Sequence, residues 1–567
     1  MHVSIAIRLA FCSMIVALLI GAETVVADAP ATAPSSSVAD QLDQQAAKSP
    51  DDAVHVGMAY YNGTDGVSQD YAKAMVYFQK AAGAGNGLAM RNLGVMYDNG
   101  QGVAQDSQKA IFWYRKAADA GDPGAMTNIG LMYSNGQGIA QDSKQAMAWY
   151  LKAANAGDAV AMRDIGSMYD DGHGVTQDYQ QAMAWYRKGA AAGDTGAMVN
   201  IGLMYDKGRG IAQDSQQAMA WYRKAAAGGE ALAMRNIGVM YDNGQGVAQD
   251  NQQAMAWYRK AAAAGDTGAM VNLGMMYSNG QGVAADGQQA MDWYRKAADA
   301  GDSLAMRNIG SMFDEGHGVA QDYQQAMVWY RKSADAGDSG AMLNIGLMYD
   351  NGHGVAQDSQ QAMAWYRKAA DAGEAVAMRN IGVMYDNGQG VAQDSQQAMA
   401  WYQKAADAGD SGAMRNIALM YANGQGVTQD FQQAMTWYRK AADAGDAGAM
   451  TNIGLLYSNG QGVAQDYQQA MAWYRKAADG GEAIAMRNIG ALYDDGHGVA
   501  QDNQQAMAWY QNAAAGGDAG AMYNIGVMYD NGQGVAQDPV QAISWYHKAA
   551  ALGDEYAKKR LAALGIQ

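Results

Sequence analysis

Apolar residues recur along this chain in two short helical patterns that alternate with a period of 36 residues. Within residues 89–98 the apolar side chains stand three or four positions apart. They are Ala89, Met90, Leu93, Met96 and Tyr97. Residues 106–120 repeat this spacing at Ala110, Trp113, Tyr114 and Ala117. Such spacing predicts two amphipathic helices in every repeat.

Capping residues mark the expected ends of these helices. Asp106 precedes the second helix, where its carboxylate is expected to accept the free amide hydrogens of the first turn. Asp538 repeats this cap and is followed by Pro539, a residue favoured at the first helical position. Gly100 and Gly121 stand where each helix is expected to end with a positive φ. The sequence therefore predicts a helix-turn-helix unit.

The unit is copied along most of the chain. Its first full copy is residues 89–124, and all 13 tryptophans follow the period. Full copies fill residues 89–556, a looser copy precedes them at 54–88, and half a unit follows at 557–567. One helix pair cannot bury its apolar face alone, so stacked copies must build a continuous core. We expect an all-α, α/α superhelical solenoid of about 14 repeats, ending in a C-terminal capping helix.

The repeat resembles the Sel1-like repeat, a relative of the tetratricopeptide repeat. The matching positions in the first full copy are Ala89, Leu93, Gly94, Tyr97, Gly100, Gly102, Val103, Asp106, Ala110, Trp113, Tyr114, Lys116, Ala117, Ala118 and Gly121. Ala418 and Phe313 depart from the motif glycine and tyrosine of their copies. The resemblance implies an α/α solenoid that serves as a protein-interaction scaffold, often in bacterial envelope or secreted proteins. It does not extend to the family's cysteine-rich, β-lactam-binding branch, because this chain has 1 cysteine.

The sequence of the N-terminal region predicts that the protein is exported. Residues 1–27 have the pattern of a signal peptide: Arg8 is basic, residues 9–22 are apolar, and residues 25–27 are small at the expected cleavage site. The apolar run is shorter than the ~20 residues that span a bilayer, although an uncleaved anchor is the alternative. Residues 28–52 are expected to be a flexible linker with a helical turn near residues 38–47, and residues 53–567 form the solenoid. A periplasmic or secreted protein is predicted, with no integral membrane segment after cleavage.

The composition narrows the classes of partner that the protein is expected to bind. The net charge of −17 and the pI of about 4.7 argue against binding to nucleic acid or to an anionic membrane. The aspartates at positions 106 and 122 recur through the repeats and explain much of this acidity as helix capping and solubility. The alternative is an acidic surface that selects a basic partner.

No catalytic constellation is present in the sequence. It lacks the zinc-protease, phosphate-loop, nucleophile-elbow and serine β-lactamase motifs, so we expect no enzyme, no metal site and no cofactor. His173, His317, His353 and His497 replace Gln101 in their copies and are interpreted as exposed loop residues rather than zinc ligands. The Trp-Tyr pairs are expected to pack in the core rather than to stack on sugars.

A row of asparagines is the best candidate for a binding site. Each directly precedes the Leu-Gly or Ile-Gly pair of a first helix, or Ile417-Ala418 in one copy, off the apolar face, and only Asp164 interrupts the row. The row consists of Asn92, Asn128, Asn200, Asn236, Asn272, Asn308, Asn344, Asn380, Asn416, Asn452, Asn488 and Asn524. An amide offers both a donor and an acceptor, which suits the backbone of an extended peptide in a concave groove. The alternative is a structural bond to a neighbouring helix in every copy.

The residue before each asparagine is the most variable in the repeat. It is arginine in seven copies, at Arg91, Arg163, Arg235, Arg307, Arg379, Arg415 and Arg487, and Thr, Val, Leu or Tyr in the others. Arginine can bind a carboxylate of a ligand through two parallel hydrogen bonds. Alternatively, each arginine pairs with a nearby aspartate, such as the Asp98 row. Variation within an otherwise constant repeat is where binding specificity would be encoded.

These features predict a secreted or periplasmic scaffold that binds a protein partner, as an extended segment in its concave groove. The alternative function is binding of peptidoglycan or another envelope polysaccharide. That alternative requires exposed aromatic rings in the groove, whereas the helical spacing places the tryptophans and tyrosines inside. The partner's identity does not follow from the sequence.

Overall fold

The computed structural model describes residues 36–566, and the elements of this part of the chain are helices. The first helices of the repeats are α3 (Pro50–Asn62), α5 (Gly87–Asn99), α7 (Pro123–Asn135), α9 (Ala159–Asp171), α11 (Thr195–Lys207), α13 (Ala231–Asn243), α15 (Thr267–Asn279), α17 (Ser303–Glu315), α19 (Ser339–Asn351), α21 (Ala375–Asn387), α23 (Ser411–Asn423), α25 (Ala447–Asn459), α27 (Ala483–Asp495) and α29 (Ala519–Asn531). The second helices are α4 (Tyr71–Gly83), α6 (Ser107–Asp119), α8 (Ser143–Asn155), α10 (Tyr179–Ala191), α12 (Ser215–Ala227), α14 (Asn251–Ala263), α16 (Gly287–Asp299), α18 (Tyr323–Asp335), α20 (Ser359–Asp371), α22 (Ser395–Asp407), α24 (Phe431–Asp443), α26 (Tyr467–Asp479), α28 (Asn503–Ala515) and α30 (Pro539–Ala551). Helices α2 (Ser36–Ala46) and α31 (Glu555–Ala563) flank them.

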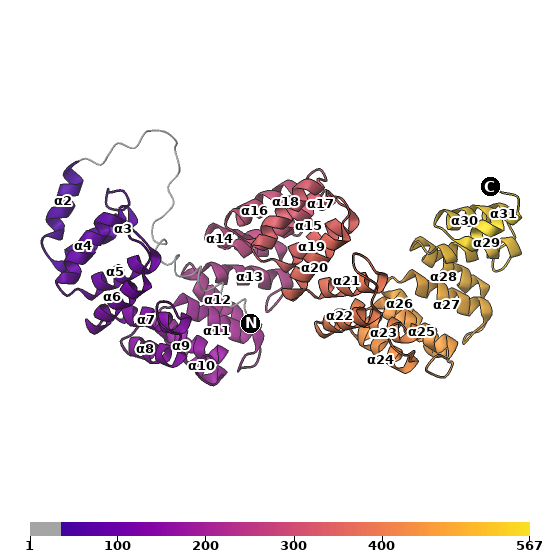
Figure 1. The fold of residues 1–567 in the computed structure, drawn as a ribbon, viewed down its shortest axis with the longest axis horizontal. Helices are drawn as coiled ribbons and strands as arrows, with labels where there is room; N and C mark the ends of the chain where they lie inside the picture. Colours follow the sequence, from indigo (N-terminus) through magenta and orange to yellow (C-terminus); the bar gives the residue numbers. More distant parts are fainter. Residues whose placement is uncertain (1–35, 567) are drawn as a thin grey trace. The chain divides into compact units, whose positions relative to one another are not determined.

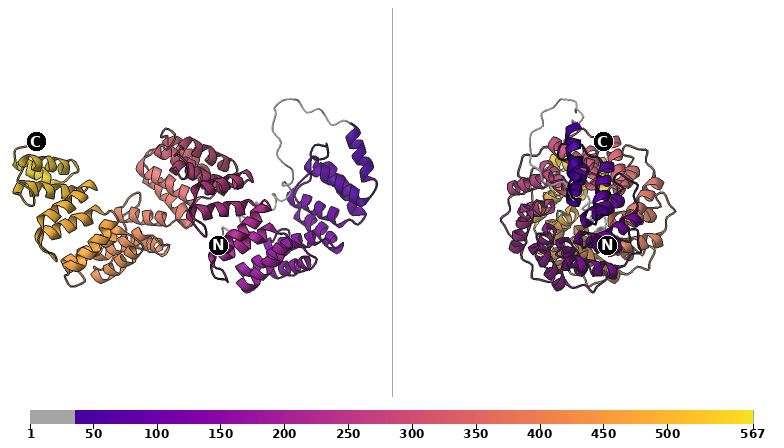
Figure 2. Two further views of the ribbon diagram at one scale, coloured as in Figure 1. Left: turned by 180° about the vertical axis from the view of Figure 1, so that it is seen from behind. Right: turned by 90° about the vertical axis from the view of Figure 1, so that its left-hand side faces the viewer.

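Contacts divide the chain into two compact units, one up to Lys296 and one from Ala297. Within each unit the first helix of a repeat packs against its own second helix, which in turn packs against the first helix of the next repeat. Figures 1 and 2 show this stacking of helix pairs inside each unit. The expected all-α solenoid with a 36-residue period is thereby confirmed. No helix within residues 36–566 has the length and apolar character needed to cross a bilayer.

The predicted caps are present. The Asp106 carboxylate accepts the backbone amides of Gln108 and Lys109 at 3.1 and 3.0 Å, and Asp122 accepts the amide of Ala125 at 2.7 Å. Gly100 ends α5 with a φ of 68°. These contacts satisfy amides that the helices leave unpaired at their first turns.

The core is built between neighbouring repeats, as the stacking argument predicts. One cluster joins the second helix α6 to the first helix α7 of the next repeat. Its buried members are Ala110, Ile111, Tyr114, Ala117, Ala118, Ala125, Ile129 and Met132. Tyr114 lies flat against α5, and a β-carbon at Gly94 would stand 2.5 Å from its ring. The motif glycine therefore makes room for the buried tyrosine.

The tryptophans pack against the core, as expected, but remain partly exposed. Tyr114 is only 2% exposed, whereas Trp113 beside it is partly exposed. Twelve of the rings pack against the core cluster of the preceding repeat, as Trp149 does on the cluster around Tyr114. A lysine three residues later lies over the ring, for example Lys260 at 4.1 Å from the centroid of Trp257. The indole lies at the edge of the core because it packs against residues of the preceding repeat as well as its own.

The two flanking helices cover the terminal repeats. In α2 Leu42 and Ala46 are buried against the first cluster, so residues 36–46 form a packed helix where the sequence predicts a flexible linker with one helical turn. In α31 Ala557 and Leu561 are buried on α30, and Arg560 binds Asp530. The signal peptide and residues 28–35 of the linker lie outside the described residues.

Candidate functional site

The asparagine row lies on a partly exposed face of the first helices. All twelve asparagines are partly exposed. Three residues after each asparagine position most copies carry an apolar side chain, which we call the apolar row. Its members are Met58, Val95, Leu131, Leu203, Val239, Met275, Leu347, Val383, Leu419, Leu455 and Val527. Residues three apart are neighbours on a helix, so the two rows share one surface, the first-helix face.

The asparagines also contact the core. In six copies the amide lies against the hydroxyl of a buried tyrosine from the preceding second helix. The pairs are Asn236–Tyr222, Asn272–Tyr258, Asn380–Tyr366, Asn416–Tyr402, Asn488–Tyr474 and Asn524–Tyr510. Burial raises the pKa of Tyr474 to about 12, and the polar side chains of Ser458 and Asn488 oppose this rise. These contacts give the row a structural role, and its ligand-binding role stays a prediction.

All seven arginines of the variable row pair with aspartates. The partner is the N-cap aspartate of the next first helix, at 3.0 Å in Arg379–Asp410 and 3.7 Å in Arg415–Asp446. The remaining pairs are Arg91–Asp122, Arg163–Asp194, Arg235–Asp266, Arg307–Asp338 and Arg487–Asp518. The aspartate-pairing alternative therefore describes the row, although the partner is the Asp122 row instead of the Asp98 row.

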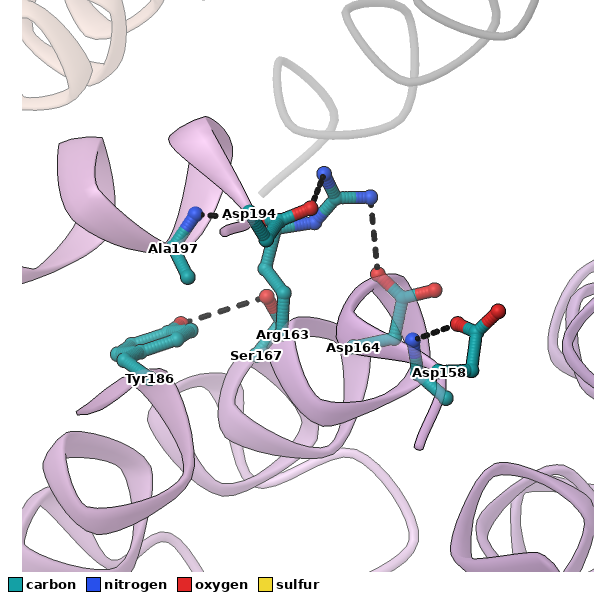
Figure 3. A network of polar contacts seen from close by, with 8 residues as sticks. Asp158, Arg163, Asp164, Ser167, Tyr186, Asp194 and Ala197 are labelled. Atoms are coloured by element: carbon teal, nitrogen blue, oxygen red, sulfur yellow. Dashed lines mark hydrogen bonds and ion pairs between the residues drawn. The ribbon is translucent and has the colours of Figure 1, made fainter. Parts of the chain in front are cut away.

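Figure 3 shows one such pair in detail. The Arg163 guanidinium lies between Asp164 and Asp194, at 3.4 and 3.2 Å. Asp194 also accepts the amide of Ala197, so it caps α11 while it binds an arginine from α9. Burial raises the pKa of Asp194, and the Arg163 charge opposes that rise. Each pair thus joins two successive first helices.

A glycine accompanies each of these arginines, a feature that the sequence analysis missed. Near the start of the next first helix stands Gly124, Gly196, Gly268, Gly340, Gly412, Gly448 or Gly520. A β-carbon at Gly268 would overlap the guanidinium of Arg235. Where the variable residue is not arginine, the same position holds Val160, Leu232, Leu304, Val376, Ile484 or Tyr556. This covariation inside the chain is a signal that could have revealed the junction between repeats.

Two open hollows lie on the first-helix face of the second unit. One, of about 480 Å³, is lined by Asp314, Glu315, Gln321, Tyr323, Asn344, Leu347, Met348, Asn351 and His353. The other, of about 400 Å³, is lined by Arg487, Gly520, Tyr523, Asn524, Asp554 and Tyr556. Each hollow therefore contains one member of the asparagine row.

The four loop histidines are exposed, as the sequence predicts. His353 and His497 stack on Tyr323 and Tyr467, with ring centroids 4.7 and 4.6 Å apart. Across residues 36–566 no three histidine, cysteine, aspartate or glutamate side chains gather in an arrangement that could hold a metal ion.

The Sel1 repeat family matches fourteen consecutive segments of 36 residues, from 51–86 to 519–554. The chain belongs to this family. Its Sel1 repeats begin at the first helices described above. They contain the asparagine row, the apolar row and the residues of both hollows, apart from Tyr556, which follows the last repeat. The match places the looser first copy in the same family as the others, so the resemblance seen in the sequence is confirmed.

Solved structures of other Sel1 proteins are similar to this chain. A protective antigen present in uropathogenic Escherichia coli strains, with an SLR fold, is 36% identical over 73% of this chain and 89% of its own, with a TM-score of 0.45. A Sel1 repeat protein from Oxalobacter formigenes is 38% identical over 44% of this chain and 99% of its own, with a TM-score of 0.40. None of the curated proteins matches.

Solenoids of the Sel1 and tetratricopeptide type are generally protein-interaction scaffolds and typically have no catalytic activity. Membership of the Sel1 family therefore agrees with the general function predicted from the sequence, that of a protein-interaction scaffold. The compartment and the surface that this protein uses belong to the proposal below.

Proposed function

We propose that this Sel1 protein is a secreted or periplasmic scaffold that binds an extended segment of a protein partner on its first-helix face, without catalysis of its own. The observation that carries the proposal is the position of the two hollows, which contain Asn344 and Asn524. An amide beside an apolar side chain suits an extended segment, because the amide bonds its backbone while the apolar residue packs against its side chains.

The residues of the variable row change the chemistry of this face from copy to copy. An arginine copy presents an ion pair above a glycine, whereas in a copy such as Val199 with Leu232 the valine is buried and the partly exposed leucine lies at the surface. Junctions with and without arginine alternate in the first unit, whereas in the second unit Arg379 and Arg415 stand in consecutive copies. A partner segment with a matching alternation would be selected by this surface.

Export of the protein rests on residues 1–27, whose basic, apolar and small-residue pattern predicts a cleaved signal peptide. The mature chain would then act in the periplasm or outside the cell, where envelope and secreted proteins are the available partners.

Binding of an envelope polysaccharide is the second candidate function. Its support is the hollow around Tyr523 and Tyr556, since Tyr556 is 68% exposed and its ring lies 5.9 Å from that of Tyr523. Exposed aromatic rings beside Asn524 are the feature that stacking on a sugar requires.

Capture from a cell-envelope extract separates these functions. The bait is the mature chain, compared with a variant carrying Leu203→Ser, Val239→Ser and Val383→Ser. Serine already stands in this row at Ser167 and Ser311, so the fold tolerates it. The control is Val328→Ala on a second helix, where Val328 is 47% exposed. We expect the serine variant to lose a protein that the parent and the control retain.

Two outcomes would contradict the proposal. Equal capture of the protein by the serine variant would mean that another surface binds it. Retention of the parent on purified sacculi, lost in a Tyr523→Ala and Tyr556→Ala variant, would establish the polysaccharide function instead.

A further inference from the structure

The hollow between α17 and α19 has the chemistry of a cation site. Its lining includes the carboxylates of Asp314 and Glu315 but no lysine or arginine. Helix α17 ends at Glu315 and α19 ends at Asn351, so both helices direct the negative ends of their dipoles toward this region. Leu347 adds an apolar wall and Tyr323 an aromatic ring.

The first unit contains the same arrangement four repeats earlier, and there the chain fills it with its own arginine. Arg209 reaches back from its loop to Asp170, with Nη1 3.5 Å from Oδ2. Burial raises the pKa of Asp170, and the Arg209 charge opposes this rise. The surroundings match residue by residue: Gln177, Tyr179, Asn200, Leu203 and Met204 correspond to Gln321, Tyr323, Asn344, Leu347 and Met348.

A loop residue also binds the carboxylate of the preceding repeat in one further copy. Gln137, at the position of Arg209 in an earlier copy, donates to the Asp98 carboxylate at 2.9 Å. The copy with the hollow has His353 at this position, and its ring stacks on Tyr323. Lys207, the other cation near the filled site, corresponds to Asn351. Arg209 and Lys207 of the filled site are thus replaced by His353 and Asn351 where the hollow is open.

The two carboxylates of the hollow contact side chains of their own repeat. Asp314 accepts the hydroxyl of Tyr330 at 3.2 Å, and Glu315 lies 2.7 Å from Nδ1 of His317. Glu315 is 60% exposed, so a second donor can approach it from solvent. A guanidinium fits such a pair of carboxylates better than an ammonium because it is planar and carries five donors.

We infer that the hollow between α17 and α19 receives an arginine side chain from a basic segment of the partner, with its guanidinium at Asp314 and Glu315. This inference rests on the proposed function and names the chemistry of the bound segment. The guanidinium lies beside the stacked rings of Tyr323 and His353, Leu347 packs on the aliphatic stem, and Asn344 bonds the backbone. The excess of negative charge on the chain favours the same partner.

Equilibrium dialysis of the whole chain with a labelled, terminally blocked leucine–arginine–leucine tripeptide tests this inference. The probe control replaces arginine with citrulline, which has the same shape without the charge. We expect the arginine tripeptide to occupy one site and to bind about tenfold or more tightly than the citrulline tripeptide. Asp314→Asn with Glu315→Gln is expected to remove that difference.

Two further variants copy residues that the chain already carries, so both are expected to fold. His353→Arg installs the arrangement of Arg209 and is expected to abolish binding. Lys207→Asn with Arg209→His opens the filled site and is expected to raise the number of bound tripeptides from one to two. Circular dichroism melting checks the fold of each variant.

Equal binding of the two tripeptides, or unchanged binding by the His353→Arg variant, would overturn the inference. These results are distinguishable from failure of the scaffold proposal. The extract capture depends on the apolar row, whereas the dialysis depends on charge in one hollow. A protein captured by a chain that ignores the arginine tripeptide would refute this inference alone.

Discussion

At the scale of single residues, the most regular contact is that between a tryptophan and the lysine three positions later. Twelve of the rings carry such a lysine, 3.7 Å from the centroid over Trp185 and 5.2 Å over Trp113. Trp509 is followed by Asn512 instead. The ring is half-buried, so a cation over it is partly desolvated and stabilises the repeat.

Lys260→Ala is expected to lower the stability of its repeat by about 0.5–1 kcal/mol, because Trp257 loses its cation. Asn512→Lys should raise stability by a similar amount at Trp509. Native-state hydrogen exchange of the α13–α14 and α27–α28 amides measures both changes. A neutral result at both positions would show that these contacts are incidental.

Several residue roles follow from the sequence, and others need the packed structure. Helical spacing predicts that Tyr114 is buried, and it is 2% exposed. The same spacing places Trp113 inside, yet a ring of that size at the edge of two repeats stays partly exposed. The partner of Arg163 is 31 residues away at Asp194, which becomes close only when successive first helices are stacked.

At the scale of elements, the junction between repeats has two forms. One pairs an arginine with the N-cap aspartate of the next first helix and requires a glycine beneath the guanidinium, as at Arg235 and Gly268. The other fills the space with apolar side chains, as at Val199 and Leu232. The two residues of a junction are therefore coupled and must change together.

A double-mutant cycle at Arg235 and Gly268 tests this coupling. Gly268→Leu alone is expected to destabilise the first unit by about 1–3 kcal/mol, because its side chain meets the guanidinium. Arg235→Val with Gly268→Leu copies the apolar junction and should recover most of that loss. Urea unfolding followed by circular dichroism gives the energies. Additive effects of the two substitutions would mean that the junction residues act independently.

Helix boundaries followed well from the sequence because each is marked locally, by Asp106 at an N-cap and by Gly100 at a C-cap. Helix α2 was less predictable. Its buried residues Leu42 and Ala46 are few, and the helix is held by packing on the first cluster instead of by strong local signals. The helical turn expected near residues 38–47 is thus part of a longer helix that packs on the first repeat.

At the scale of the whole molecule, the buried tyrosines of the second helices couple stability to alkaline pH. Burial raises the pKa of Tyr438 and of Tyr474 to about 12, above the ordinary value of 10.0. Between these values the folded chain binds more protons than the unfolded chain, so stability falls as the pH rises through this window.

We expect helicity to be lost cooperatively between about pH 10 and 12, together with the appearance of phenolate absorbance. Circular dichroism and ultraviolet absorbance on the same samples check this. Helicity that is fully retained after all tyrosines have formed phenolates would show that the buried tyrosines ionise in the folded chain.

The ligand-binding role of the asparagine row depends on the molecule's surface and could not be decided from the sequence. A side chain at this position has two uses, since Asn524 contacts the buried Tyr510 and also lines a hollow. A substitution in the asparagine row would therefore change both the stability of the fold and the binding of a partner. A substitution in the apolar row separates the effect on binding from the effect on stability more cleanly.

Hydroxyl-radical footprinting of the mature chain, with and without its captured protein partner, tests the central claim most directly. Met275 and Leu419 of the apolar row are 43% and 36% exposed, whereas Phe112 and Val328 on second helices are 51% and 47% exposed. The account predicts that the partner protects Met275 and Leu419 from oxidation and leaves Phe112 and Val328 unchanged. Protection of the second helices with none on the apolar row would contradict binding at the first-helix face.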